Sequence, residues 1–160
     1  MHSRLLVQAA LTAAVLFAAN EAPAQDTVTA PSHGYIYAAP VLTSGGLASG
    51  AQVGGGGDTK LYKNLALSGD VGWIVAQDGF GLASVNGTYN LPSFRDGKLA
   101  PFVTSGYTLG FRDSTASFMN VGGGFTYWFR ERQGLRWEAR YYTSADFIGI
   151  VALRVGFSFR

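Results

Sequence analysis

Apolar residues recur at every second position through most of this chain, from Gly34 to its end, in segments separated by short polar or glycine-rich clusters. In segment 65–75, for example, Leu67 and Trp73 share one parity and Asp70 has the other. Successive side chains of a β-strand point to opposite faces, so a period of two predicts strands with one apolar and one polar face. The pattern confines the chain to an all-β fold.

Seven clusters of turn-forming residues divide this region into eight segments. The clusters are 43–46, 58–64, 77–79, 92–98, 112–116, 130–134 and 144–146. All are short enough for hairpins, which predicts an antiparallel meander. Alternation is least regular in the first two segments, Gly34–Thr43 and Leu47–Gly57, so eight strands is the expected number and six is the lower bound. In the first segment we expect Tyr35, Tyr37 and Val41 to share the apolar face.

The chain begins with the pattern of a secretory signal peptide. Arg4 supplies a positive charge, residues 5–19 are apolar, and Ala22-Pro23-Ala24 has the small-x-small form that signal peptidase accepts. A membrane anchor is the alternative, but the apolar stretch is shorter than the roughly 20 residues that a spanning helix needs. We therefore expect a signal peptide at 1–24, cut after Ala24, a short periplasmic segment at 25–33 and one barrel domain at 34–160.

Composition excludes several other classes of protein. The chain has no cysteine, so disulfides cannot stabilise it and a thiolate zinc site is impossible. The net charge of +2 is too small to indicate a nucleic-acid partner. Only 14% of the residues are charged and 48% are hydrophobic, yet no apolar run after the leader approaches the length of a membrane helix. A closed barrel is the other structure that satisfies its backbone groups in lipid.

Alternation alone does not say which face points into a barrel, because soluble barrels turn their apolar face inward and membrane barrels turn it outward. The aromatic residues favour a membrane barrel: if the strands run up and down in turn, most aromatics gather at the two rims, at headgroup level. At the end that holds the chain termini we expect Tyr35, Tyr37, Tyr62, Tyr89, Tyr127, Phe129, Trp137, Phe157 and Phe159. At the opposite rim we expect Trp73, Phe111, Tyr141 and Phe147, together with Phe80 and Phe118, whose side-chain direction the pattern leaves open. Phe80 and Leu82 fall out of phase with their segment.

The predicted fold is thus an eight-stranded antiparallel up-and-down transmembrane β-barrel, and its interior face carries charges. Those charges are Asp70, Arg136, Glu138, Arg140 and Arg154. We expect Glu138 to be the only acidic residue close to the arginines, with Asp70 on a more distant strand. Charges inside a barrel must be paired or hydrated, so one interpretation is a salt-bridged plug that fills the lumen. The other is a narrow, arginine-lined path for anions, for which glycines at 106, 110, 122 and 124 leave room.

Three sequence segments show the resemblance to a known family: Lys98–Val103 (KLAPFV), Asn120–Trp128 (NVGGGFTYW) and Leu135–Tyr142 (LRWEARYY). With the strand pattern around them, the chain resembles the small outer-membrane β-barrel superfamily of outer membrane protein A transmembrane domains and opacity-type porin-like proteins. The resemblance implies a monomeric barrel in the bacterial outer membrane, in contact with its lipid. It also implies that periplasmic chaperones and the barrel assembly machinery are partners during biogenesis. Members that bind host or phage partners carry long loops, so the short clusters here disfavour adhesion.

A few barrels of this size are enzymes that modify lipid A, and they need a histidine with a serine and a carboxylate near the outer leaflet. After the leader this chain has one histidine, His33, which precedes the first strand at the periplasmic side. We expect a solvated terminal residue there, and we expect no catalytic site, cofactor or metal. The run Gly54–Gly57 lacks the Gly-Lys-Ser/Thr ending of a phosphate loop, and we interpret it as a strand end that runs into a turn.

The function predicted from these features is a non-enzymatic contribution to envelope structure. One alternative is a narrow porin-like channel for small solutes, which a conducting lumen would distinguish. The other is a soluble periplasmic barrel that binds a small ligand, which would not fractionate with membranes.

Overall fold

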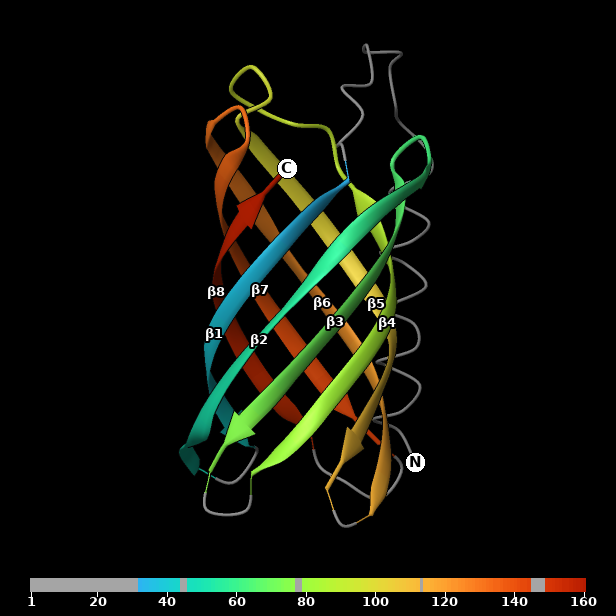
Figure 1. Cartoon of the computed structure of the whole chain (residues 1–160), viewed down its shortest axis with the longest axis vertical. Helices are drawn as coiled ribbons and strands as arrows, with labels where there is room; N and C mark the ends of the chain where they lie inside the picture. Colours follow the sequence, from blue (N-terminus) through green and yellow to red (C-terminus); the bar gives the residue numbers. More distant parts are fainter. Residues whose placement is uncertain (1–31, 44–45, 77–78, 113, 145–148) are drawn as a thin grey trace, which may run out of the picture.

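The computed structural model describes residues 32–43, 46–76, 79–112, 114–144 and 149–160. They form eight strands, each paired antiparallel with its neighbours in the chain, and the last strand pairs with the first to close a barrel (Figure 1). The strands are β1 His33–Thr43, β2 Gly46–Tyr62, β3 Leu65–Val75, β4 Phe80–Asn90, β5 Leu99–Phe111, β6 Thr115–Arg130, β7 Gln133–Thr143 and β8 Ile150–Phe159. The predicted all-β, eight-stranded antiparallel barrel is confirmed.

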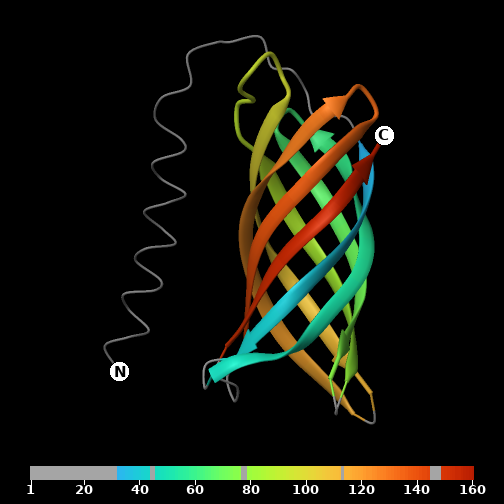
Figure 2. The ribbon, with the colours of Figure 1, turned by 90° about the vertical axis from the view of Figure 1, so that its left-hand side faces the viewer.

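The strands are steeply tilted around the barrel axis, as the two views at right angles show (Figures 1 and 2). β1 begins beside the end of β8, where Gly34 pairs with Phe159. We call this the termini end, and it also holds the connections β2–β3, β4–β5 and β6–β7. The far end holds the other four connections. No helix within the described ranges is long and apolar enough to cross a membrane.

The second strand is longer than the alternation predicts. Residues 58–64 were expected to form a turn, but β2 continues to Tyr62, because Asp58 and Lys60 pair with Ser68 and Ala66 of β3. The glycine run 54–57 therefore lies within the strand and does not end it. One consequence matters for the site: Asp58 keeps the parity of the interior residues of β2.

Most large apolar side chains point outward and most polar ones point inward, which is the arrangement of a membrane barrel. On β3, Val71 is 63% exposed whereas its neighbour Asp70 is 4% exposed. Most of the aromatics predicted at the rims lie on this outer surface. They are the exposed Tyr62, Trp73, Tyr89, Phe111, Phe129, Tyr141 and Phe159 and the partly exposed Tyr127, Trp137 and Phe157. Phe147 lies outside the described residues.

The predicted sidedness of β1 is wrong. Tyr35, Tyr37 and Val41 point into the barrel and are 6% exposed or less, whereas Ile36 between the tyrosines is 59% exposed. Both faces of β1 are largely apolar, so its own sequence does not mark the inner one. The interior has room for the tyrosines because β1 pairs with glycines: Tyr37 lies opposite Gly54 of β2, whose added Cβ would approach the Tyr37 Oη within 2.6 Å.

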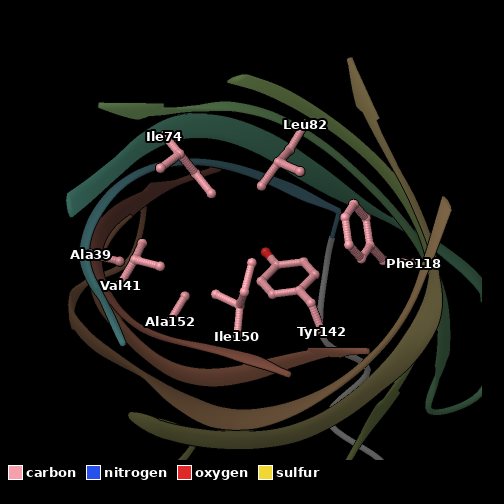
Figure 3. Close-up of a cluster of buried hydrophobic side chains, with 8 residues drawn as sticks. All are labelled: Ala39, Val41, Ile74, Leu82, Phe118, Tyr142, Ile150 and Ala152. Carbon is pink, nitrogen blue, oxygen red and sulfur yellow. The ribbon is translucent and has the colours of Figure 1, made fainter. Parts of the chain in front are cut away.

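The interior near the far end is filled by apolar side chains, which we call the apolar plug (Figure 3). Its members are Ala39, Val41, Ile74, Leu82, Phe118, Tyr142, Ile150 and Ala152, with Phe80 packed against them. Phe80 and Phe118 were expected at this rim with their direction left open, and the structure turns both toward the interior. The phase break at Phe80 and Leu82 has a structural cause, because β4 begins with apolar residues that enter the plug.

Candidate functional site: the interior ionic network

The middle of the barrel interior is occupied by charged side chains from β7 and β8. Arg136, Glu138 and Arg140 stand at alternate positions of β7, so all three point inward, and Arg154 of β8 is the register partner of Glu138. Each of the four is at most 4% exposed. The alternation of the sequence thus placed these charges on the face where the structure has them.

Asp70 reaches these arginines from β3, on the opposite wall of the barrel. Arg140 Nη1 donates to Asp70 Oδ2 at 2.7 Å, and Arg154 Nη2 donates to Asp70 Oδ1 at 3.1 Å. The expectation that Asp70 is remote from the arginines is therefore wrong. An eight-stranded barrel is just wide enough for its side chains to meet, so long guanidinium side chains span the lumen.

Glu138 lies among three guanidinium groups. Its Oε2 accepts from Arg136 Nη2 at 3.2 Å, and its Oε1 accepts from Arg140 Nε. Arg154 Nη1 lies 3.8 Å from the same Oε1. Glu138 thus neutralises the mutual repulsion of three like charges that are held in a space with little water.

A third carboxylate, Asp58 of β2, completes the network. It was not predicted to face inward, because residues 58–64 were expected to form a turn. Arg136 Nη1 donates to Asp58 Oδ2 at 3.1 Å. Within the described interior, three guanidinium groups therefore face three carboxylates, and Glu138 is not the only acid beside the arginines. The signal was present in the alternation: Asp58 has the parity of Gln52, and both are buried.

His33 belongs to the same network and is not solvated as predicted. Its side chain is 7% exposed, and its Nε2 lies 3.3 Å from Asp58 Oδ2 and 3.4 Å from Arg136 Nη1. The ring also packs edge-on against Trp128, with a centroid separation of 5.5 Å. The reason is that β1 begins at His33 and carries it inward at the termini end, where Trp128 covers it.

Aromatic rings cover the guanidinium groups where carboxylates do not. The Arg136 Cζ lies 4.4 Å from the centre of the Tyr35 ring and 3.9 Å from the centre of the Phe102 ring. Arg154 lies 4.1 Å from the Tyr37 ring and donates to the Tyr142 hydroxyl. These cation–π contacts strengthen in a desolvated setting. They explain why the tyrosines of β1 are inside, and Tyr142 links the ionic network to the apolar plug.

The other half of the lumen, on β3 to β6, carries neutral hydroxyl and amide groups. Thr88 Oγ1 lies 2.6 Å from Ser68 Oγ and donates to Thr104 Oγ1 at 3.1 Å. Asn120 Nδ2 donates to Asn86 Oδ1 at 2.7 Å, and Asn86 Nδ2 in turn donates to Asp70 Oδ2 at 3.4 Å. The neutral half thus joins the ionic half through one carboxylate.

The network leaves little open space. A pocket at the termini end, lined by His33, Phe102, Trp128 and Arg136 among others, has a volume of about 10 Å³. That is roughly the room that one water molecule needs. Each carboxylate already accepts from guanidinium groups, and no group of three or more His, Asp or Glu that could hold a metal ion occurs in the described part of the chain. The arrangement is suited to filling a lumen.

Solved structures with the same fold are small outer-membrane barrels, whereas no protein-family model and no curated protein matches the chain. The N-terminal β-barrel domain of Pseudomonas aeruginosa OprF is 20% identical, with a TM-score of 0.57, over 79% of this chain and 97% of that one. Neisserial surface protein A (NspA) is 13% identical, with a TM-score of 0.63, over 80% and 94%. Ail of Yersinia pestis is 12% identical, with a TM-score of 0.54, over 80% and 95%. The chain therefore has the fold of the small outer-membrane β-barrels.

Proposed function

We propose that the protein is a non-enzymatic outer-membrane barrel with a sealed lumen, and that it contributes to the structure of the envelope. The observation that carries the proposal is the filled interior. Three guanidinium groups pair with three carboxylates in the middle of the barrel, and the apolar plug closes the far end. Such a barrel supplies a stable membrane body but no path for solutes.

The paired arginines argue against the narrow anion channel. Arg136, Arg140 and Arg154 each lie within ion-pair distance of a carboxylate, so the interior network carries no net positive charge to attract anions. An anion on this path would also have to enter the apolar plug, where a bare charge is strongly disfavoured. The pocket beside Arg136 at the termini end has a volume of about 10 Å³, which is about the room that one water molecule needs.

The outer surface argues against a soluble barrel that carries a ligand. Large apolar side chains at mid-barrel, such as Val71, Val85 and Leu153, are 45% exposed or more. Contiguous apolar surface of this extent marks a membrane or partner interface. Catalysis is disfavoured as well, because His33 is held by Asp58 and Arg136 at the termini end.

Conductance in planar lipid bilayers tests the sealed lumen. We expect the unmodified protein to conduct near the background, because paired charges and the plug fill the lumen. Glu138→Gln should raise the conductance, since it leaves three arginines with two carboxylates in the interior. The matched control is Glu131→Gln in the exposed β6–β7 turn, which should not change it. Substantial conductance of the unmodified protein would favour the porin-like channel instead.

Export depends on residues 1–24, which lie outside the described residues. We propose that they are a signal peptide cut after Ala24, since Ala22 and Ala24 provide the small side chains of the cleavage site. Mass spectrometry of the membrane-extracted protein should then show a chain that begins at Gln25. A mature chain that retains Met1 would contradict the export proposal.

A further inference from the structure

Exposed basic residues gather at the termini end of the barrel. We call them the rim cations: Lys60, Lys63, Arg95, Lys98, Arg130, Arg132 and Arg160. The exposed acidic side chains described at this end are Asp96 and Glu131. The ion pairs between described residues all lie inside the barrel, so these seven cations are not neutralised by them.

The far end differs in its described residues. It carries one exposed cation there, Arg112. Among the described residues, exposed cations are therefore concentrated at the termini end.

Four rim cations directly follow an exposed aromatic residue. The pairs are Tyr62-Lys63, Phe94-Arg95, Phe129-Arg130 and Phe159-Arg160, and their aromatic members are 66%, 59%, 43% and 47% exposed. They come from the β2–β3 turn, the β4–β5 connection, the end of β6 and the end of β8, so they are spread around the barrel. In the first pair the Lys63 Nζ lies 5.2 Å from the centre of the Tyr62 ring. In the last pair the Arg160 guanidinium lies 3.8 Å from the centre of the ring of the buried Trp128, so this cation covers the mouth of the barrel.

We propose that the rim cations bind the anionic headgroups of phospholipids in the bilayer that the barrel spans. Aromatic side chains prefer the headgroup level of a membrane, and basic residues at that level attract anionic headgroups. A soluble polyanion would need one compact basic patch, whereas these cations come from three connections and the strand ends beside them, and from the end of β8, spread around the barrel. The inference rests on the membrane location proposed above, and it adds a lipid class and names the end of the barrel that binds it.

The test is the lipid selectivity of the membrane-extracted protein in phosphatidylcholine vesicles. Spin-labelled phosphatidylglycerol and phosphatidylcholine are added separately, and electron spin resonance gives the fraction of each held at the protein surface. We expect about fivefold preference for phosphatidylglycerol, the fold-change that corresponds to about 1 kcal/mol for one basic contact. The preference should shrink in 0.5 M NaCl, because salt at roughly that concentration screens exposed charges. The fourfold variant Lys63→Gln, Arg95→Gln, Arg130→Gln, Arg132→Gln should lose the preference.

The double variant Asp96→Asn, Glu131→Gln is the matched control, because it removes charges of the opposite sign from the same rim and should keep or increase the preference. If the fourfold variant does not fold, the pairs Lys63→Gln, Arg95→Gln and Arg130→Gln, Arg132→Gln should each lose part of it. An unchanged preference in these variants, or none in the unmodified protein, overturns the proposal. So does retention of heparin by the protein without any lipid preference, which would indicate a soluble polyanion. Heat-modifiable gel migration, followed in parallel, reports whether the closed barrel itself is present.

Discussion

The two halves of the lumen are both polar, but they hold the barrel together in different ways. In the charged half, hydrogen bonds cross the lumen: Arg140 and Asp70 are 70 positions apart in the chain, and Arg136 and Asp58 are 78 apart. In the neutral half, Ser68 bonds Thr88 of the adjacent strand, only 20 positions away. Long ionic side chains therefore connect opposite walls, whereas short hydroxyl groups mainly reinforce neighbouring strands.

This difference has an energetic consequence. A buried ion that loses its partner has no water to replace it, so each carboxylate in the charged half is costly to remove. A neutral hydroxyl that loses its partner forfeits one modest hydrogen bond. We therefore expect substitutions in the charged half to lower the free energy of unfolding much more than substitutions in the neutral half.

The largest effect should come from Glu138→Gln. The change removes a charge that faces Arg136, Arg140 and Arg154, and it should lower the free energy of unfolding by about 3–5 kcal/mol. Urea unfolding in lipid vesicles measures the change. Glu131→Gln, which is exposed in a turn, should shift it by less than about 0.5 kcal/mol. Equal effects of the two substitutions would show that the ionic network does not stabilise the barrel.

The next effect compares two adjacent positions of β8. Arg154 is buried against Asp70, whereas Leu153 is 45% exposed on the outer surface. Leu153→Arg puts the same side chain in contact with lipid without a partner, and it should cost about 2–4 kcal/mol near mid-membrane. Refolding yield and urea unfolding in vesicles report the loss. If Leu153→Arg leaves the free energy of unfolding unchanged and Ala152→Arg lowers it, the assignment of the inward and outward faces of β8 is reversed.

The smallest effect should come from the neutral half. Thr88→Val keeps the shape of the side chain but removes the hydroxyl that contacts Ser68 and Thr104, so it should cost about 1 kcal/mol. The control is Thr59→Val, at an exposed position of β2, which should be close to neutral under the same urea titration. A cost as large as that of Glu138→Gln would remove the distinction between the two halves.

The fold could be predicted from the sequence wherever a segment has one polar and one apolar face. In β7, for example, Arg136, Glu138 and Arg140 alternate with apolar residues, and their inward direction followed directly. β1 could not be assigned in this way, because Tyr35 and Tyr37 are themselves amphipathic and their neighbours are apolar. Its pairing with β8 resolves the direction: Ile36 lies opposite the outward Phe157, and paired residues share a face.

The sequence predicted the interior charges on β3, β7 and β8, but it did not predict Asp58 of β2 or which charges form pairs. Asp58 was assigned to a turn because four glycines precede it, although its parity with Gln52 marked it as an interior residue. The direction of Phe118 was left open because the residue is aromatic and lies near a rim. Its parity is that of Asn120, which is buried, and opposite to that of Met119, which is 66% exposed.

The sequence was sufficient for the class of the fold, for an expected number of eight strands and for the presence of charges on the inner face, because the direction of a side chain along a strand is a local property with a period of two. Tertiary structure alone decided which charges meet. Arg140 of β7 finds Asp70 of β3 only after the sheet closes, when strands far apart in the chain become opposite walls of one narrow lumen. Closure also decided that Tyr35 and Tyr37 face inward, since the paired strands, and not β1, supply the space and the guanidinium groups that hold them.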